Sequence, residues 1–338
     1  QFDEAFISGL EGLSYEDVAK RIIEPFVEGE ISETDLSDIV DRAYETFSHK
    51  AITPLVQNDS NEWILELFHG PTLAFKDVAM QLLALLTDHV LAQRGQRVAI
   101  VGATSGDTGG AAIDAFKGRA NSDIFVLFPH GKVSDVQRWQ MTGVQDKNVH
   151  ALAIDGTFDD CQALVKAMFN HHGFRDDVNL TGVNSINWGR VLAQVVYYFS
   201  SAVSLGAPHR EVSFTVPTGN FGDAFAGYLA MQCGLPIQSI LVATNSNDIL
   251  DRFFKDNDYS VQKVVPTRYL ILKKSKASPA KLVFGAFGKE SGTERILKSH
   301  SLKSQDVLKV KSLKDLLNMD PMVFVFVTTA KVSLLDLS

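Results

Sequence analysis

The chain has 338 residues, of which 45% are hydrophobic and 21% charged, and it carries a net charge of -8. A chain of this length usually forms more than one hydrophobic core, so two lobes are expected. The composition excludes a disordered chain. The net negative charge and the lack of an evident basic face argue against nucleic-acid binding. No apolar run reaches the roughly 18 residues of a membrane-spanning helix, so no membrane contact is expected.

The sequence contains two cysteines, Cys161 and Cys233, and each lies within an apolar segment. Such placement is typical of reduced thiols in a protein core rather than of a disulfide framework. We therefore expect a cytoplasmic protein, with an organellar compartment as the alternative.

Residues 1–52 show an acidic, helical pattern, which predicts a helical cap at the N-terminus. Ser14 and Ser32 each precede acidic residues and a periodic apolar segment, as helix N-caps do. Residues 54–67 alternate enough to predict a strand or a hairpin.

The middle of the chain alternates strands and helices. Strands are predicted at residues 96–101, 123–128 and 149–154, as short apolar runs buried on both faces of a parallel sheet. Helices are predicted at residues 109–117, 133–141 and 158–169. This alternation predicts a doubly wound α/β lobe.

The last part of the chain begins with a long apolar segment at residues 188–205, which predicts an interior helix. Its aromatic residues Trp188, Tyr197, Tyr198 and Phe199 are expected in the core. Further buried strands are predicted at residues 212–217, 240–244 and 322–327, and lysine-rich surface helices and loops at 273–314.

Lys76 follows a run of small and apolar residues and opens a periodic apolar segment, residues 78–91. We predict that this lysine is buried at a helix start. Desolvation and the positive end of the helix both lower the pKa of its amine, so the amine can form a Schiff base. The alternative is a lysine whose stem packs while its ammonium group reaches water.

The first glycine-rich loop, residues 102–110, lies between a predicted strand and a predicted helix. Backbone N–H groups, hydroxyls and a helix N-terminus at such a place bind an anion. The spacing of its residues matches neither a P-loop nor Gly-x-Gly-x-x-Gly, so the sequence does not support a nucleotide-binding site. A tight turn whose Ser and Asp cap the helix is the alternative.

The second glycine-rich loop, residues 217–223, has the same placement. Gly219 and Gly222 allow backbone amides to approach a ligand closely, which predicts a second anion site. A structural turn is again the alternative. One buried lysine and two anion sites suit a phosphorylated aldehyde cofactor and an anionic substrate.

Four segments carry a resemblance to a known family: GPTLAFKD (residues 70–77), ATSGDTG (103–109), VNSINW (183–188) and PTGNFGD (217–223). They resemble segments of the threonine synthases, which are pyridoxal-phosphate enzymes of the tryptophan-synthase-β fold type. The order is kept from about residue 53 to residue 251.

The resemblance implies an α/β fold with two doubly wound lobes of the tryptophan-synthase-β type, PLP fold type II, and a helical N-terminal cap. It places the cap at residues 1–52. A large cofactor domain would comprise residues 53–95 and 206–338, and a smaller α/β substrate domain residues 96–205.

The resemblance also implies roles for individual residues. Lys76 would bind pyridoxal 5'-phosphate as a Schiff base and then act as the general base. The cofactor phosphate would lie at Gly219, Asn220, Phe221, Gly222 and Asp223, and Thr329 would meet the pyridine nitrogen. The substrate would be held by Ser105, Asp107, Thr108, Asn184 and Arg190. No metal is expected, because His171 and His172 are adjacent, would point apart on a helix and lack a third ligand.

The implied reaction converts O-phospho-L-homoserine and water to L-threonine and phosphate by β,γ-elimination and hydration. Two alternatives stay open. One is another PLP lyase of fold type II, a serine/threonine dehydratase. The other is a threonine-synthase-like cofactor-binding protein without full activity, because the chain lacks the family's His-Pro after Thr329-Ala330. Monomer and homodimer are both compatible with the sequence.

Two junctions depart from the family, Leu10–Glu11 and Thr267–Arg268, where additional residues are usual. We hypothesise that residues are omitted from the chain at both junctions. The flanking Cα atoms would then be separated by much more than the roughly 3.8 Å of a trans peptide. A real deletion is the alternative.

Overall fold

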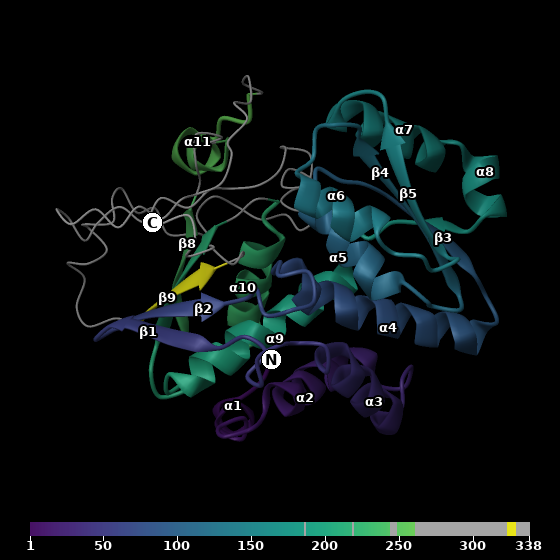
Figure 1. Ribbon diagram of the computed structural model, residues 1–338. Helices are drawn as coiled ribbons and strands as arrows, with labels where there is room; N and C mark the ends of the chain where they lie inside the picture. Colours follow the sequence, from purple (N-terminus) through teal and green to yellow (C-terminus); the bar gives the residue numbers. More distant parts are fainter. Residues whose placement is uncertain (186, 218–219, 244–248, 261–322, 329–338) are drawn as a thin grey trace. The chain divides into compact units, whose positions relative to one another are not determined.

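The computed structural model describes residues 1–185, 187–217, 220–243, 249–260 and 323–328 (Figure 1). Contacts divide the chain into two units. The first unit comprises Gln1–Ile22, Thr53–Leu67 and Gln194–Ser338, and the second comprises Ile23–Ile52 and Phe68–Ala193. The domain boundaries implied by the family stay a prediction.

The first unit is built on a five-stranded sheet in the order β1-β2-β9-β7-β8. Its strands are β1 (Leu55–Asp59), β2 (Glu62–Glu66), β7 (Val212–Pro217), β8 (Ile237–Ala243) and β9 (Val323–Thr328). The antiparallel pair β1 and β2 confirms the hairpin, and the other pairings are parallel. All six residues of β7 are buried, as expected for a strand with neighbours on both sides.

The helices α1 (Glu4–Ser8), α10 (Gly222–Gln232) and α11 (Ile249–Asp256) belong to the first unit, and α2 (Tyr15–Val27) and α9 (Trp188–Ser204) include residues of both units. The interior position of α9 is confirmed for Tyr197, Tyr198 and Phe199, which are fully buried. It is wrong for Trp188, which is 47% exposed and meets the Phe26 ring at 5.9 Å.

The second unit is built on a four-stranded parallel sheet in the order β5-β4-β3-β6. Its strands are β3 (Val98–Ala103), β4 (Ser122–Pro129), β5 (Val149–Ile154) and β6 (Leu180–Thr181). Its helices are α3 (Glu33–Tyr44), α4 (Lys76–Arg94), α5 (Asp107–Phe116), α6 (Asp135–Thr142), α7 (Phe158–Asn170) and α8 (His172–Asp177).

Adjacent residues of β3 and β4 pack into two different cores. Ile100 and Val126 join a core formed with α4, α5 and Met141 of α6. Val101 and Leu127 join a second core that contains Cys161 of α7. Because successive side chains of a strand point to opposite faces, helices cover both faces of this sheet. The predicted doubly wound lobe is confirmed.

The prediction that β5 is buried on both faces is wrong. β5 is an edge strand, and Leu152 in its middle is 45% exposed. Val149 and Ala151 still pack against the first of the two cores and Ile154 against the second, so both faces of the strand are only partly covered. An edge strand can have the same apolar composition as an interior strand. The sequence pattern therefore gave the wrong prediction for β5.

Two predicted helix caps are confirmed in the N-terminal region. The Ser14 hydroxyl accepts the Asp17 N–H at 3.1 Å, and the Ser32 hydroxyl accepts the Asp35 N–H at 3.1 Å. At the junction Leu10–Glu11, consecutive hydrogen bonds close a turn, from Leu10 N to Ile7 O and from Glu11 N to Ser8 O, both at 3.1 Å. The expected separation is therefore not seen there. Residues 267–268 and 273–314 lie outside the described residues.

Candidate active site

Lys76 is the first residue of α4, as predicted. Its side chain is only 12% exposed, and its Nζ lies 4.0 Å from Asp107 Oδ2 and 4.4 Å from the centroid of the Phe75 ring. This low exposure favours the predicted buried lysine over the alternative in which the ammonium group reaches water. A mostly buried amine beside one carboxylate and one aromatic ring can both carry a covalent group and move a proton.

The turn before Lys76 is held by Asp77, which sequence reasoning missed. Its carboxylate accepts the Thr72 N–H at 2.8 Å and the Thr72 hydroxyl at 2.6 Å. Leu73 in this turn has a φ of 60°, a strained value for a side-chain-bearing residue. The clue in the sequence was a carboxylate directly before the apolar segment of this helix. Asp77 therefore stabilises a strained turn directly beside the reactive lysine.

Asp77 has an unusual protonation behaviour. It is fully buried, and burial raises the pKa of its carboxyl to about 6, while the hydrogen bonds from Thr72 oppose that rise. At neutral pH the carboxylate is thus ionised in an environment that disfavours its charge.

We predict that the free energy of unfolding falls as pH rises from about 4 to 6, because the unfolded chain loses the Asp77 proton first. Because the pKa of Asp77 is raised in the folded protein, its protonated carboxyl contributes to the free energy of unfolding below about pH 4. This contribution, up to about 3 kcal/mol, is lost as the pH rises to about 6. Asp77→Asn keeps a side-chain acceptor for Thr72 and should flatten this part of the curve. Urea unfolding of both proteins at several pH values tests it, and equal slopes would contradict it.

The first glycine-rich loop connects β3 to α5, as predicted. The Thr104 hydroxyl accepts the N–H of Gly106 at 3.0 Å and of Gly109 at 2.9 Å, and it donates to Gly106 O at 3.1 Å. The N-cap of α5 is Gly106, and no side chain caps it. Thr104, rather than Ser105 or Asp107, therefore holds this loop by hydrogen bonds.

Three predicted substrate residues lie on this loop: Ser105, Asp107 and Thr108. Ser105 is exposed, and the other two are half-buried. Their backbone N–H groups have no hydrogen-bond partner among the described residues, so they are available at a helix N-terminus. Such groups can bind a carboxylate or phosphate.

Asn184 and Arg190 have different surroundings. Asn184 is exposed, whereas Arg190 is only 4% exposed and donates from Nη1 to Val183 O at 2.9 Å. The guanidinium thus supports the segment that precedes α9. A role of both residues at the substrate phosphate stays a prediction.

The second glycine-rich loop connects β7 to α10 in the first unit. Gly219, like Thr329, lies outside the described residues. Asn220 is exposed, and α10 begins at Gly222. Phe221 is 2% exposed and has a φ of 65°, a genuine outlier for a bulky residue. Strain of this kind clusters at ligand sites, which supports the predicted anion site.

Asp223 in the first turn of α10 is held from α9. Its carboxylate accepts the Ala224 N–H at 2.9 Å, and its carbonyl accepts the Tyr198 hydroxyl at 2.8 Å. Burial and the Asp223 charge raise the pKa of Tyr198 well above its usual range, so the hydroxyl stays protonated and can donate. Gly227 provides the space, because a Cβ there would lie 2.8 Å from the Tyr198 ring.

Tyr198→Phe is expected to lower the free energy of unfolding by about 1–3 kcal/mol, because a buried carbonyl loses its donor. Tyr197→Phe is the comparison variant, since the equally buried Tyr197 hydroxyl contacts side chains, Gln194 at 3.4 Å and Tyr198, rather than a backbone carbonyl. Urea unfolding of both variants checks the difference. Equal losses would show that the bond to Asp223 contributes nothing specific.

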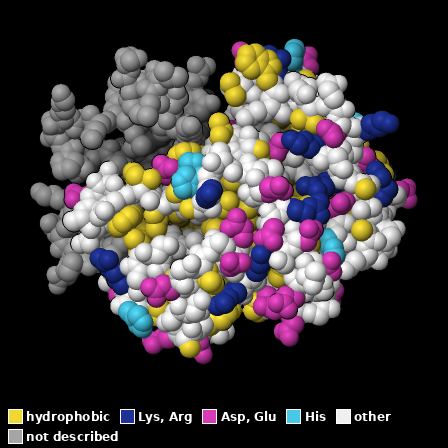
Figure 2. Space-filling view, turned by 60° about the horizontal axis from the view of Figure 1, so that its bottom comes forward, with side chains coloured by type: hydrophobic (Ala, Val, Ile, Leu, Met, Phe, Trp, Pro, Cys, Tyr) yellow, Lys and Arg dark blue, Asp and Glu magenta, His cyan; other side chains and the backbone are white. Residues whose placement is uncertain are grey.

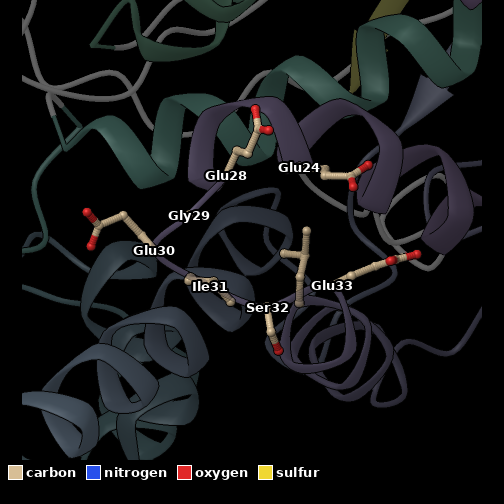
Figure 3. Close-up of a pocket in the computed structure, with 8 residues that line it drawn as sticks. Glu24, Glu28, Gly29, Glu30, Ile31, Ser32 and Glu33 are labelled. Atoms are coloured by element: carbon tan, nitrogen blue, oxygen red, sulfur yellow. The ribbon is translucent and has the colours of Figure 1, made fainter.

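A pocket of about 380 Å³ lies at the turn between α2 and α3 and is not a candidate for an anionic substrate. Figure 3 shows Glu24, Glu28, Glu30 and Glu33 around it. Four carboxylates repel a phosphorylated ligand.

The described part of the chain holds no cluster of three or more His, Cys, Asp or Glu side chains suited to a metal ion. None of its helices is long and apolar enough to cross a membrane. On the face drawn in Figure 2, basic side chains are interspersed with acidic ones. That face gives no support to nucleic-acid binding.

Comparison with known protein families identifies the class of enzyme. Residues 47–299 match the family described as "Pyridoxal-phosphate dependent enzyme". Residues 1–44 match "Threonine synthase N terminus". The chain therefore belongs to the threonine synthase family of pyridoxal-phosphate-dependent enzymes.

Individual relatives support this assignment. The chain is 56% identical to threonine synthase of Pseudomonas aeruginosa over 76% of this chain and 55% of that protein. It is 47% identical to threonine synthase of Saccharomyces cerevisiae over 73% of this chain and 51% of that protein. It thus spans about half the length of these curated relatives.

A solved structure is also similar to this chain. The PLP-bound threonine synthase from Brucella melitensis matches with a TM-score of 0.82 and 45% identity, covering 98% of this chain and 81% of that chain. The predicted fold class, PLP fold type II with N-terminal helices, is confirmed.

Proposed function

We propose that the chain converts O-phospho-L-homoserine and water to L-threonine and phosphate. The relatives named above are named threonine synthases, and the observation that carries the proposal here is the Lys76 amine. It is mostly buried at the start of α4, with the Asp107 carboxylate 4.0 Å away.

The residues of the chain fit pyridoxal 5'-phosphate. Lys76 offers a sheltered amine for its aldehyde, and α10 begins with a strained backbone at Phe221 that suits an anion site. Residues 219–223 would hold its phosphate, and Thr329 its pyridine nitrogen. When bound, this cofactor withdraws electrons and so stabilises negative charge that develops on the substrate.

The chain's own groups supply orientation and proton transfer. Lys76 removes the proton from the substrate Cα as general base. The N–H groups of Ser105, Asp107 and Thr108 bind the substrate carboxylate at the N-terminus of α5. Asn184 and Arg190 help to hold the substrate phosphate.

Two assays on the full chain with added cofactor test the proposal. Phosphate release from O-phospho-L-homoserine, together with threonine formation, is the expected result. Ammonia release from threonine without phosphate release would instead indicate a dehydratase. Bound cofactor with no threonine formed would indicate a related binding protein.

We also propose a cytoplasmic location. Cys161 and Cys233 are both free, and Cys161 is buried, as in proteins of reducing compartments.

A further inference from the structure

Helix α6 reaches the carboxylate that faces Lys76. The Gln137 side chain donates from Nε2 to Asp107 Oδ1 at 2.6 Å, while Asp107 Oδ2 lies 4.0 Å from Lys76 Nζ. Gly106 leaves room for this contact, because a Cβ there would lie 2.2 Å from the Gln137 side chain. The two oxygens of Asp107 therefore point to two different partners, one on α6 and one on α4.

The same helix also reaches the turn before Lys76. Gln140 donates from Nε2 to Thr72 O at 3.2 Å, in the turn that Asp77 holds. Gln137 and Gln140 are three positions apart, so they lie on one face of α6. One helix face thus contacts both loops that carry the reactive groups of this unit.

We propose that Gln137 is a positioning residue that directs the Asp107 carboxylate toward the Lys76 amine, while Gln140 holds the turn that carries the lysine. A hydrogen bond to a carboxylate is among the stronger side-chain bonds, so it can fix the direction of Asp107. The part of this inference that concerns cofactor attachment rests on the proposed function.

Gln137 has a second, purely structural contact that an experiment must separate from the first. Its Oε1 accepts the Ser134 N–H at 3.2 Å, and its own N–H donates to the Ser134 hydroxyl, which forms a capping box at the start of α6. The amide nitrogen serves Asp107, and the amide oxygen serves the cap. Gln137→Glu keeps an acceptor for the cap and removes the donor to Asp107.

The first measurement uses the full chain without cofactor. Amide hydrogen exchange of residues 102–110, followed by mass spectrometry, reports the stability of the Asp107 loop. We expect exchange about tenfold faster in Gln137→Glu and in Gln137→Met, because a bond to a charged group is lost. Ser134→Ala removes the cap hydroxyl, which also donates to Gln137 Oε1 at 3.0 Å, but it keeps the Gln137 donor to Asp107. Its effect on this segment should therefore be clearly smaller than that of the two Gln137 variants.

The second measurement adds pyridoxal 5'-phosphate to the same proteins. Attachment joins Lys76 Nζ to the aldehyde carbon as a C=N bond and releases one water, and borohydride reduction preserves the link for mass spectrometry. We expect attachment about tenfold slower in both Gln137 variants, since a misdirected carboxylate no longer assists proton transfer at the amine. Ser134→Ala, which keeps the Gln137 donor to Asp107, should slow attachment clearly less than the two Gln137 variants do.

Each outcome decides the matter. Unchanged exchange in the Gln137 variants, or an equal effect of Ser134→Ala, overturns the inference. Faster exchange with unchanged attachment overturns it as well, because the direction of Asp107 would then not matter for the amine. If the unchanged chain attaches no cofactor, the proposed function fails, and the exchange measurement still decides whether Gln137 positions the loop.

Discussion

Lys76→Ala is expected to reduce phosphate release from O-phospho-L-homoserine by at least about 10²-fold, the lower bound for a lost general base. The same change should abolish borohydride-stable attachment of pyridoxal 5'-phosphate. Both effects have one cause, since the mostly buried amine beside Asp107 is the group that would bind the cofactor and move the proton.

Lys117→Ala is the matched control for this experiment. Lys117 lies in the same unit, is 46% exposed and pairs with Asp114 at the end of α5. Its replacement should leave phosphate release within about twofold, as for most surface substitutions. Attachment or turnover that survives Lys76→Ala would refute the assignment of the reactive amine.

Gly70→Ala is expected to lower the free energy of unfolding by about 1–3 kcal/mol, as overpacking does. An added Cβ would lie 2.3 Å from Asp77 Cβ and 2.6 Å from its Oδ2. Asp77 cannot move aside easily, because it is fully buried and accepts two hydrogen bonds from Thr72. Displacement of Asp77 also shifts Lys76, so turnover should fall by as much as about 10²-fold.

Gly102→Ala separates this clash from a general effect of replacing glycine by alanine. A Cβ at Gly102 meets no heavy atom of the described residues within 4 Å. Urea unfolding of the cofactor-free proteins should show a change within about 0.5 kcal/mol for Gly102→Ala. If both variants lose the same free energy of unfolding, the close approach of Gly70 to Asp77 does not contribute to stability.

Features that depend on neighbouring residues were predicted well. The apolar run before Lys76 and the periodic segment after it predicted a sheltered lysine at a helix start, and the structure has both. The polar residues Ser14 and Ser32 predicted two helix starts correctly. Hydrophobic period and capping act within a few residues, so the sequence reports them directly.

Features that depend on distant partners were missed. The bond from Gln137 to Asp107 joins residues 30 positions apart, and that from Gln140 to Thr72 joins residues 68 apart. The edge position of β5 and the exposure of Trp188 were likewise missed. No local pattern distinguishes an edge strand from an interior strand of the same composition.

The order of its motifs and its alternating apolar segments, read from the sequence alone, determined the family, the α/β class and the lysine at the centre of the proposed chemistry. Only the tertiary structure decided which side chains hold that lysine: Asp107 across from it, Asp77 in its turn and Gln137 behind Asp107. The physical reason is that a hydrogen bond forms wherever packing brings two groups within about 3 Å, and strand order and helix packing set that distance.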